Sequence, residues 1–578
     1  MGHTVADQMW EMLANAGVSR CYGIVGDALN PVVDALRRDG RIELIHVRHE
    51  EYGAFAATAE AQITGQPVAV CGTAGPGGAH LINGLLDAKH EGAPVIAIAG
   101  DVERAIIDTG GMQGLNPYRF FEEASLYTGR LVSSKQARAV IQTAIDTAVI
   151  GQGPTVISVP GDVASAKAET GWSQTHPPQV DSTPPTPPEA DVAAMAEMIN
   201  RSEAVTIYAG HGCRDAVGEV AALAEMIKAP VGYTFRGKEL LEAATPNAVG
   251  MTGLLGWGGA YDALHSADLI LLLGADFPFP GFLPDEVPAV QVDKAASHIG
   301  RRMPVVLGLV GDVGATLRAL AGRVAPKGDD THLRRHLRQT EHWRDRLRHH
   351  TDRGSELKTI RPEYLASVVS DLADEDAIFT VDTGTPCMWV ARHVAATGRR
   401  RVIGSLSWAS MACAAPYGLG AALAAPGRQV VAMCGDGGFT MLALGDLITQ
   451  VRYGARVVHV VFDNQQLDFV NIEQQEAGMI PFGTGMANPD LAAVAQALGA
   501  HGIRLTEPGD VRETVAEALA WQGGPVVIDA VVDPVALELP SHIPGKVARG
   551  FTLSSAKRVF AGQLPELAHE LADNVRVL

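Results

Sequence analysis

The chain has 578 residues, 47% of them hydrophobic and 5% aromatic, with 46 basic against 65 acidic side chains and a formal net charge of −19. A chain of this length exceeds what one hydrophobic core supports, so we expect three domains of ordinary size. The acidic balance argues against nucleic acid as the main partner, because binding a phosphate backbone favours a basic protein face.

The sequence shows no targeting segment. Residues 1–7 begin an amphipathic helix and lack the basic region and apolar core of a signal peptide. No apolar stretch reaches the roughly 18 residues that cross a bilayer. The six cysteines have no CxxC or metal-ligand spacing, so we interpret them as reduced, buried thiols and expect a cytoplasmic protein.

The first block of the chain contains two predicted strand-to-helix junctions. Residues 44–47 form a strand, and Arg48-His49-Glu50-Glu51 begins a helix over residues 52–63. Acidic residues are common at helix N-termini because of the helix dipole, so Glu50 alone indicates little. A second strand, at residues 67–71, leads through a glycine-rich loop at 72–80 into a helix that contains Asn83. Such a loop turns the chain sharply or holds a phosphate, and by itself it is a weak signal.

Two segments divide the chain. The proline-rich segment 177–188 cannot continue a helix or a central strand, so it ends a first domain at residues 1–176. A charged helical stretch after residue 326 predicts a solvated helix between a central domain at 189–326 and a third domain at 357–540. A tail follows at 541–578. All three blocks alternate apolar β-rich runs with helical segments, which predicts three doubly wound α/β domains with parallel sheets.

In the central block, polar loops follow the apolar runs. They occupy residues 251–254 and 273–278, while Asp293 ends a predicted strand and Gly311-Asp312 closes the block. An acid at a strand end suits a ribose hydroxyl, as in nucleotide-binding folds. Each of these features also fits an ordinary strand-end turn.

The third block carries the most specific pattern. A predicted strand at 428–433 leads into Cys434-Gly435-Asp436-Gly437-Gly438, a helix at 439–453 and a second strand at 456–461 that ends before Asn464. Because such crossovers are right-handed and the strands parallel, Asp436 and Asn464 emerge at the carboxyl edge of the sheet, where open α/β folds bind ligands.

This edge is suited to a diphosphate and a metal ion. Glycines let the backbone approach a phosphate, and a carboxylate beside an amide oxygen suits Mg²⁺. Asn464 follows Asp436 by 28 residues, which matches the thiamine diphosphate (ThDP) signature. The aminopyrimidine ring of ThDP needs a carboxylate for acid–base catalysis, and we assign this role to Glu50.

In chain order, Arg48-His49-Glu50, Gly75-Pro76-Gly77 and Gly435-Asp436-Gly437 with Asn464 resemble the ThDP-dependent 2-oxoacid decarboxylase family. The chain looks most like the FAD-containing pyruvate oxidase and pyruvate dehydrogenase (quinone) branch, and the resemblance covers nearly the whole sequence. It implies pyrimidine-binding, FAD-binding and diphosphate-binding domains in that order. It also implies active sites between subunits, with a homodimer as the minimum and a homotetramer as the usual assembly.

The resemblance also assigns roles to individual residues. Mg²⁺ would be held by Asp436, Asn464 and the main-chain carbonyl of Gln466, and Met411 would support the bent ThDP. Beside Glu50, the implied catalytic residues are Gln113, Phe469 and Glu473. The remaining implied ThDP contacts are Gly26, Asp27, His80, Asn83, Thr383, Gly384, Gly435, Gly437 and Gly438. The implied FAD contacts are Thr252, Gly253, Leu254, Gly274, Asp276, Phe277, Asp293 and Asp312.

The sequence departs from the family at the predicted substrate pocket. Met112 stands where the pyruvate oxidases have Phe, and Thr383 where they have Val. Asp468 and Asp463 replace a usual Gly and a usual Asn or Thr. A flexible Met and a hydroxyl change the shape and polarity of a pocket, so pyruvate is favoured but a close 2-oxoacid stays open.

The expected activity is oxidative decarboxylation, with electrons passing through FAD to quinone or O₂ and the acyl group passing to water or phosphate. An acetohydroxyacid synthase-like carboligase or decarboxylase with structural FAD is the alternative, and a silent cofactor-binding scaffold is a third. The C-terminal tail resembles that of the quinone-linked enzymes, so its apolar face either contacts a membrane surface or packs on the protein itself.

Overall fold

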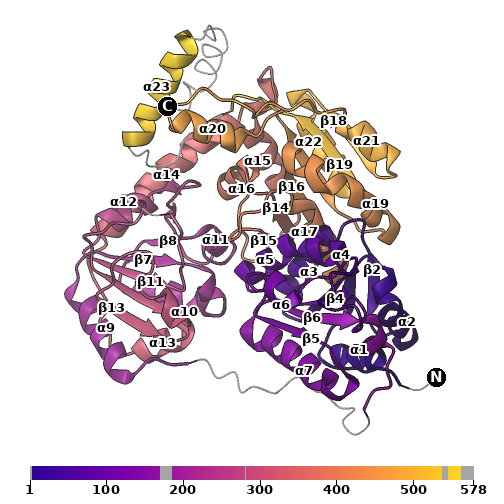
Figure 1. Ribbon diagram of the computed structural model, residues 1–578. Helices are drawn as coiled ribbons and strands as arrows, with labels where there is room; N and C mark the ends of the chain where they lie inside the picture. Colours follow the sequence, from indigo (N-terminus) through magenta and orange to yellow (C-terminus); the bar gives the residue numbers. More distant parts are fainter. Residues whose placement is uncertain (1–2, 170–184, 280, 537–544, 561–578) are drawn as a thin grey trace.

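The computed structural model describes residues 3–169, 185–279, 281–536 and 545–560. The chain forms three lobes, each built on its own parallel sheet with helices on both faces (Figure 1). This arrangement confirms the predicted fold class of three parallel-sheet α/β units. The first lobe lies below the third, and the central lobe lies beside both.

The first lobe has a six-stranded sheet in the order β2-β1-β3-β4-β6-β5. Its strands are β1 (Arg20–Gly23), β2 (Glu43–His46), β3 (Val68–Gly72), β4 (Val95–Asp101), β5 (Tyr127–Arg130) and β6 (Thr155–Pro160). Its helices are α1 (Val5–Asn15), α2 (Asn30–Asp39), α3 (Glu50–Thr64), α4 (Pro76–His80), α5 (Ile82–Glu91), α6 (Pro117–Phe120), α7 (Ser134–Gly151) and α8 (Gly161–Ala164).

The central lobe has a five-stranded sheet in the order β13-β12-β11-β7-β8 and a small antiparallel pair, β9 with β10. Its strands are β7 (Val205–Ala209), β8 (Val231–Tyr233), β9 (Gly250–Met251), β10 (Trp257–Gly258), β11 (Leu269–Leu273), β12 (Ala289–Asp293) and β13 (Leu307–Val310). Its helices are α9 (Glu189–Arg201), α10 (Val217–Met226), α11 (Phe235–Leu241), α12 (Ala260–His265) and α13 (Val313–Leu320).

The third lobe repeats the first in strand pattern, with the order β15-β14-β16-β17-β19-β18. Its strands are β14 (Ile378–Val381), β15 (Arg401–Gly404), β16 (Val430–Gly435), β17 (Val458–Asp463), β18 (His501–Leu505) and β19 (Val526–Val531). Its helices are α15 (Pro362–Leu372), α16 (Thr385–His393), α17 (Ala414–Ala424), α18 (Asp436–Gly438), α19 (Leu444–Tyr453), α20 (Asp468–Glu476), α21 (Leu491–Ala497) and α22 (Val511–Ala520), with a π-helical turn at Phe439–Ala443.

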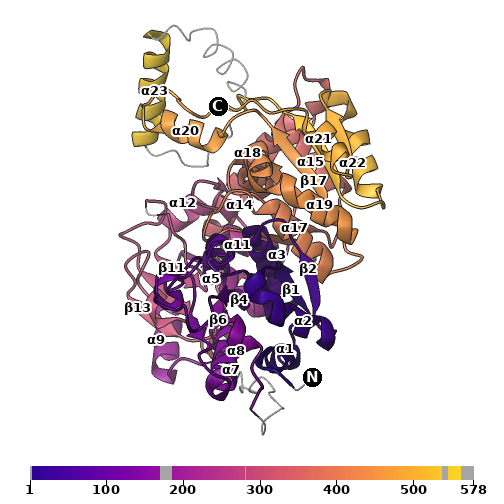
Figure 2. The ribbon, with the colours of Figure 1, turned by 45° about the vertical axis from the view of Figure 1, so that its right-hand side comes forward.

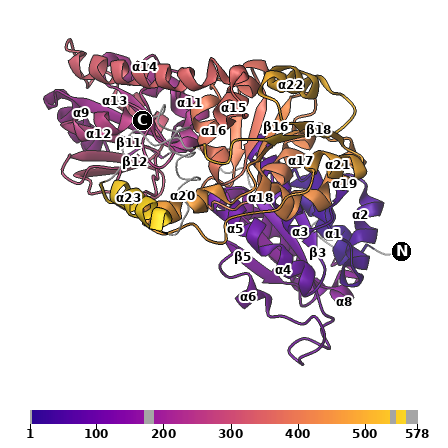
Figure 3. The same cartoon turned by 90° about the horizontal axis from the view of Figure 1, so that it is seen from above.

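A long helix, α14 (Thr331–Thr351), leads from the central lobe to the third (Figure 3). The charged stretch is therefore helical, as predicted, but it is not solvated all round. Leu333, His336 and Thr340 are buried, and the Thr340 hydroxyl accepts the Gly259 N–H at 3.1 Å. One face of the helix thus packs on the central lobe.

The first and third lobes share one hydrophobic core. Helix α3 of the first lobe packs on α17 of the third, with Phe55 near Tyr417 and both buried (Figure 2). The approach is close: a Cβ atom on Gly420 would lie 2.0 Å from the main-chain oxygen of Ala56. This packing fixes the N-terminus of α3, which begins at Glu50, against the third lobe.

The final described helix, α23 (Gly545–Phe560), lies against α20 at the edge of the third lobe (Figure 2). The Ser554 hydroxyl donates to the Met479 carbonyl at 2.6 Å, and Lys557 Nζ donates to the Gly478 carbonyl at 2.8 Å. The predicted linker and tail lie partly outside the described residues. Among the residues that are described, no helix combines the length and apolarity needed to cross a membrane.

Candidate active site

Asp436 and Asn464 lie at the carboxyl ends of neighbouring parallel strands, as the sequence predicts. Strand β16 pairs with β17 with Gly435 opposite Phe462. The Asp436 carboxylate is buried and accepts two main-chain N–H groups at 2.8 Å, from Gly437 and from Gln465. The carboxylate is therefore held rigidly at the start of the glycine-rich turn.

A second buried carboxylate, Asp463, stands beside Asp436. The Asn488 side-chain amide bridges the two, donating at 2.8 Å to each. Burial, together with the negative charge of Asp463, raises the pKa of Asp436 to about 7. Asp463 Oδ2 has no hydrogen-bond partner within the part of the chain that the structure describes. Two adjacent buried acids with one unsatisfied oxygen favour a cation at this point.

The donors at this edge suit Mg²⁺. Across the described ranges, no three His, Cys, Asp or Glu side chains gather as a metal cluster. The available oxygens are instead the carboxylates of Asp436 and Asp463, the Asn464 carboxamide and main-chain carbonyls in the turn 464–466. Mg²⁺ accepts such a small set because it completes its octahedral shell with water and phosphate oxygens.

The glycine-rich turn is closely surrounded. A Cβ atom on Gly437 would lie 3.7 Å from Met411 Sδ, so the predicted Met411 borders the turn. A Cβ on Gly438 would lie 2.3 Å from Asp382 Oδ2, and Asp382 also accepts the Gly435 N–H at 3.2 Å. Burial raises the pKa of Asp382 to about 7. Only glycine fits this turn beside the Asp382 carboxylate.

Thr383 and Gly384 also reach this edge, because they follow β14, which pairs with β16. Gly384 has a φ of 134° and precedes the first residue of α16. The chain therefore turns here through a conformation that favours glycine.

Glu50 is the first residue of α3 and is buried. Its Oε2 lies 2.9 Å from His80 Nδ1, and the His80 ring stacks on that of His49 with centroids 4.5 Å apart. A Cβ on Gly77 would lie 3.0 Å from Glu50 Oε1. The predicted loop at 72–80 is helical from Pro76 onward, where α4 begins, and only the turn after Gly72 is a loop. This loop and α4 enclose the carboxylate, and both belong to the first lobe rather than to the diphosphate edge.

Gln113 lies beside the same loop. A Cβ atom on Gly75 would lie 3.0 Å from the Gln113 Cβ. Gln113 has a φ of 63°, and the neighbouring Met112 is 84% exposed. Gly26 approaches the loop from the other side: its Cβ would lie 2.3 Å from Thr73 Oγ1, which has no hydrogen-bond partner in the described ranges.

Asn83 joins the first lobe to the third. It donates to Glu51 Oε1 at 2.7 Å and to the Ser410 hydroxyl at 3.0 Å, and it accepts from Trp408 Nε1 at 2.8 Å. Since these bonds occupy its amide, Asn83 positions the segment before Met411. Asp27 is exposed, and its carboxylate accepts the neighbouring Ala28 N–H at 2.9 Å.

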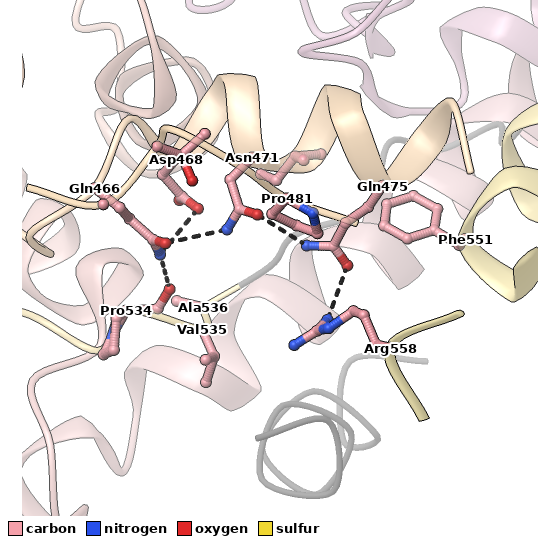
Figure 4. A pocket seen from close by; sticks show the side chains of 13 residues that line it. Gln466, Asp468, Asn471, Gln475, Pro481, Pro534, Val535, Ala536, Phe551 and Arg558 are labelled. Carbon is pink, nitrogen blue, oxygen red and sulfur yellow. Dashed lines mark hydrogen bonds between the residues drawn. The ribbon is translucent and has the colours of Figure 1, made fainter. Parts of the chain in front are cut away.

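Gln466, Phe469 and Glu473 lie on or just before α20. Phe469 packs against the core of the third lobe, and Glu473 is exposed. The Gln466 amide belongs to a chain of hydrogen bonds that runs along α20 through Asn471 and Gln475 to Arg558 of α23 (Figure 4). The residues of this chain line a cavity of about 260 Å³ between α20 and α23.

The predicted FAD residues gather at the carboxyl ends of the central strands. A Cβ on Gly253, which has a φ of 98°, would lie 2.8 Å from the Phe277 ring. Thr252 is buried, and its hydroxyl has no hydrogen-bond partner among the described residues. This buried hydroxyl is therefore free to bind a ligand or an ordered water.

The other central residues are occupied by local contacts. Asp293 ends β12 and accepts the Ala295 N–H at 2.8 Å, and Asp312 caps α13 and lies 3.2 Å from Lys294 Nζ. Asp276 pairs with Arg301 and Arg302, which hold its pKa below the usual value although burial opposes the shift. Leu254 packs against the apolar cluster that contains Phe277, and Gly274, with a φ of 52°, contacts Gly212.

Comparison with known proteins agrees with this geometry. Three family descriptions match: the N-terminal thiamine pyrophosphate (TPP) binding domain over residues 3–120, the central domain of the same enzymes over 192–320, and the C-terminal TPP binding domain over 382–530. The chain belongs to the thiamine pyrophosphate enzyme family.

Individual relatives of this thiamine pyrophosphate enzyme cover most of its length. It is 34% identical to the putative thiamine pyrophosphate-containing protein YdaP of Bacillus subtilis, over 98% of each chain. It is 31% identical to a pyruvate oxidase of Lactiplantibacillus plantarum, over 89% of this chain and 86% of the relative. It is 30% identical to the large subunit of acetolactate synthase isozyme 2 of Escherichia coli, over 92% and 95%. Because the identities to the pyruvate oxidase and to the acetolactate synthase are nearly equal, they do not show whether this chain is an oxidase or a carboligase.

The structure adds site residues of this enzyme that the sequence patterns did not assign. Asn488 bridges Asp436 and Asp463 from a loop far along the chain, and only its place before Pro489 marked a turn. Asp382 directly follows β14. An acid at a strand end is a signal in the sequence, but Asp382 lies outside the spaced residues of the ThDP motif.

Proposed function

We propose that this enzyme catalyses the oxidative decarboxylation of pyruvate or a close 2-oxoacid with ThDP, Mg²⁺ and FAD, and passes electrons to quinone or O₂. The observation that carries the proposal is Gln113 beside the loop that encloses Glu50. The pyruvate oxidases that the sequence resembles have a Gln at this place. The similarity to a pyruvate oxidase over most of both chains supports the same conclusion.

The diphosphate-binding role falls to the third lobe. Asp436, the Asn464 side-chain oxygen and the Gln466 carbonyl would hold Mg²⁺, and the main-chain N–H group of Gly438 would face the diphosphate. Asp382 and Asn488 keep this turn in place through their hydrogen bonds. When bound, ThDP would supply an electron sink for decarboxylation, and FAD would supply a two-electron acceptor for a later oxidation.

Glu50 is the acid–base group. Its carboxylate holds or releases a proton at the aminopyrimidine ring, and His80 at 2.9 Å fixes its orientation. Burial of Glu50 keeps water from competing for this proton. Gln113, Phe469 and Glu473 would face the 2-oxoacid, with Met112 and Thr383 setting the size and polarity of the pocket.

The central lobe would bind FAD. Gly253 and Gly274 allow the backbone to pack closely against Phe277 and Gly212 at this edge, and the Thr252 hydroxyl is available as a donor. Asp293 ends β12 and Asp312 follows β13 at the same edge, and carboxylates at strand ends would suit ribose hydroxyls. The corresponding domains would cover residues 1–176, 189–326 and 357–540, with a tail at 541–578.

Exposed apolar side chains near the Glu50 loop support a homotetramer with shared active sites. Met112, Tyr118 and Phe120 are 84%, 52% and 40% exposed. A second subunit that covers this surface would remove it from water. A cytoplasmic location, with peripheral membrane contact through the tail, belongs to the same proposal.

The function is tested by incubating the purified protein with ThDP, Mg²⁺, FAD and pyruvate, with and without a quinone analogue or O₂. We expect CO₂ release that depends on the electron acceptor, with Glu50→Gln as the inactive control. Acetolactate formed without an acceptor would replace the proposal with the carboligase. No CO₂ from pyruvate or 2-oxobutyrate would contradict both.

A further inference from the structure

A buried carboxylate of the third lobe accepts hydrogen bonds from the main chain just before Glu50. Asp446, on α19, is 1% exposed. Its Oδ1 accepts the Arg48 N–H at 2.7 Å, and its Oδ2 accepts the His49 N–H at 3.1 Å. The Thr449 hydroxyl donates to Oδ1 at 2.7 Å and orients the carboxylate.

These two amides belong to the N-cap residue of α3, His49, and to the residue before it. The first N–H groups of a helix have no acceptor within the helix, so they need outside partners. His49 is the N-cap residue in an extended conformation, with φ −142° and ψ 132°, and its ring accepts the Glu51 N–H. Because the two oxygens of one carboxylate hold consecutive amides, the peptide leading into Glu50 has little rotational freedom.

The Glu50 side chain is fixed from the opposite direction. Its carboxylate contacts His80 at 2.9 Å, and Gly77 leaves just enough space for it. The first lobe therefore orients the carboxylate, whereas Asp446 orients the backbone that carries it. Neither contact alone sets the position of the acid–base group.

The element that carries Asp446 starts at the diphosphate turn. Residues Asp436–Gly438 pass directly into the π-helical turn Phe439–Ala443, and α19 comes next. A π-helical turn adds a residue per turn and so rotates the helix after it, and such turns are frequent at functional sites. Here the side chains of α19 that face the first lobe include Asp446, Gln450 and Tyr453: Gln450 donates to the Tyr52 hydroxyl, and the Tyr453 hydroxyl accepts the His46 N–H, both at 2.8 Å.

Burying an apolar side chain at this interface would cost less free energy than burying a carboxylate. Burial raises the pKa of Asp446 to about 6, although hydrogen bonds from Thr449, Arg48 and His49 oppose the shift. A buried acid that accepts hydrogen bonds from two specific amides therefore indicates that a defined backbone geometry is needed here, and not packing alone.

We propose that Asp446 is a positioning residue for Glu50: it holds the Arg48 and His49 amides so that the acid–base carboxylate is set relative to the cofactor. This inference rests on the proposed function, because it takes Glu50 as the group that acts on ThDP. It assigns to a residue of the third lobe a role in positioning the acid–base group of the first lobe.

The test compares Asp446→Asn with Tyr453→Phe, which removes a hydroxyl from the same helix and interface without touching residues 48 and 49. In the protein without cofactor, amide hydrogen exchange over residues 48–51 is measured by mass spectrometry. With ThDP and Mg²⁺ bound, hydrogen–deuterium exchange at the thiazolium C2 is measured by quenched-flow NMR. ThDP affinity is measured by titration.

We expect Asp446→Asn to raise amide exchange over 48–51 and to slow C2 exchange by about 10- to 100-fold, since a misplacement near 1 Å costs that much. ThDP affinity should stay within about threefold of the wild type, because the diphosphate contacts are intact. Tyr453→Phe should leave both exchange rates near the wild-type values. If Asp446→Asn does not fold, Asp446→Glu, which keeps the charge and displaces the oxygens, takes its place.

Unchanged C2 exchange in the Asp446 variant, or equal slowing in Tyr453→Phe, would overturn the inference. Failure of the proposed function looks different: the wild-type protein itself would bind no ThDP, or Glu50→Gln would leave C2 exchange unaffected.

Discussion

Asp436 and Asp463 share one side-chain amide, that of Asn488, at the edge of the third sheet. Two buried carboxylates repel one another, and Asp463 keeps an oxygen without a hydrogen-bond partner among the described residues. Mg²⁺ would relieve this repulsion. The acid of the metal motif therefore depends on a residue outside the motif.

Asn488→Ala should weaken Mg²⁺ binding by about 10- to 100-fold, because residues that orient a metal ligand contribute about that much. Asp436→Ala should weaken Mg²⁺ and ThDP together and more strongly, since the metal joins the protein to the diphosphate. Isothermal titration of each cofactor in the presence of the other measures both effects. If Asp436→Ala bound Mg²⁺ as tightly as the wild type, Asp436 would not be a ligand of the metal.

Glu50→Gln should keep the fold and ThDP affinity but lower kcat by about 10²- to 10⁴-fold, the usual contribution of one acid–base group. The amide retains a contact with His80 while it cannot take up the proton. Steady-state rates and a thermal melt check the two halves of this statement. Near wild-type turnover would remove Glu50 from the mechanism.

The sequence predicted Glu50, Asp436 and Asn464 because strand ends and motif spacing are local signals. Asn488 and Asp446 could not be found in this way. Asn488 reaches Asp436 from 52 residues away, and Asp446 reaches Arg48 from 398 residues away. No periodicity in a single sequence records contacts over such separations.

At the level of elements, α3 and α17 are the most closely packed pair across the two cofactor-binding lobes. Gly420 faces the Ala56 carbonyl, with 2.0 Å left for a Cβ atom. The two helices must therefore separate if any side chain is added at this point.

Gly420→Ala should reduce the free energy of unfolding by about 1–3 kcal/mol, the usual cost of overpacking a core. It should also lower activity, because α3 carries Glu50. Gly445→Ala, on α19 with no atom within 4 Å of the added Cβ, is the matched control. Urea unfolding gives the stability of both variants, and equal values would show that the helices tolerate separation.

Helix α14 packs on the central lobe through neutral histidines. His332 Nε2 lies 2.9 Å from the Thr206 hydroxyl, which itself donates to the Ala263 carbonyl, so the histidine is the donor. Burial lowers the pKa of His332 to about 4, and the charges of His336 and Arg335 act in the same direction while Asp268 opposes them.

The unfolded chain therefore binds the proton on His332 more readily than the folded protein. The free energy of unfolding should fall as pH falls from about 6.5 to about 4. Above and below this range, His332 adds no pH dependence. His332→Gln should reduce the slope. Urea unfolding at pH 7 and pH 5 measures it, and an identical pH dependence in both proteins would refute the assignment.

The sequence predicted these elements with different success. The strand ends around Asp436 and Asn464 fell close to β16 and β17, because apolar runs bounded by glycine and asparagine are clear signals. The helix predicted over 439–453 instead begins with a π-helical turn, which the spacing of apolar residues does not reveal. Helix α14 looked solvated because its charged residues outnumber the few that reach the central lobe.

For the molecule as a whole, charged residues connect the three lobes. Glu239 of the central lobe accepts the Val402 N–H at 2.6 Å and pairs with Arg401 at 3.2 Å in the third lobe. Arg236 pairs with Glu91 of the first lobe at 3.3 Å and donates to the Ser407 hydroxyl at 3.0 Å. This junction places the central lobe against both TPP-binding lobes.

The most direct test of the proposed oxidase activity is anaerobic stopped-flow spectroscopy of the purified protein with FAD, ThDP and Mg²⁺. Addition of pyruvate should bleach the flavin absorbance within one turnover, and O₂ or a quinone should restore it. Omission of ThDP, or Glu50→Gln, should prevent the bleaching. A flavin that stays oxidised while pyruvate is consumed would contradict the proposal and make FAD a structural group of a carboligase.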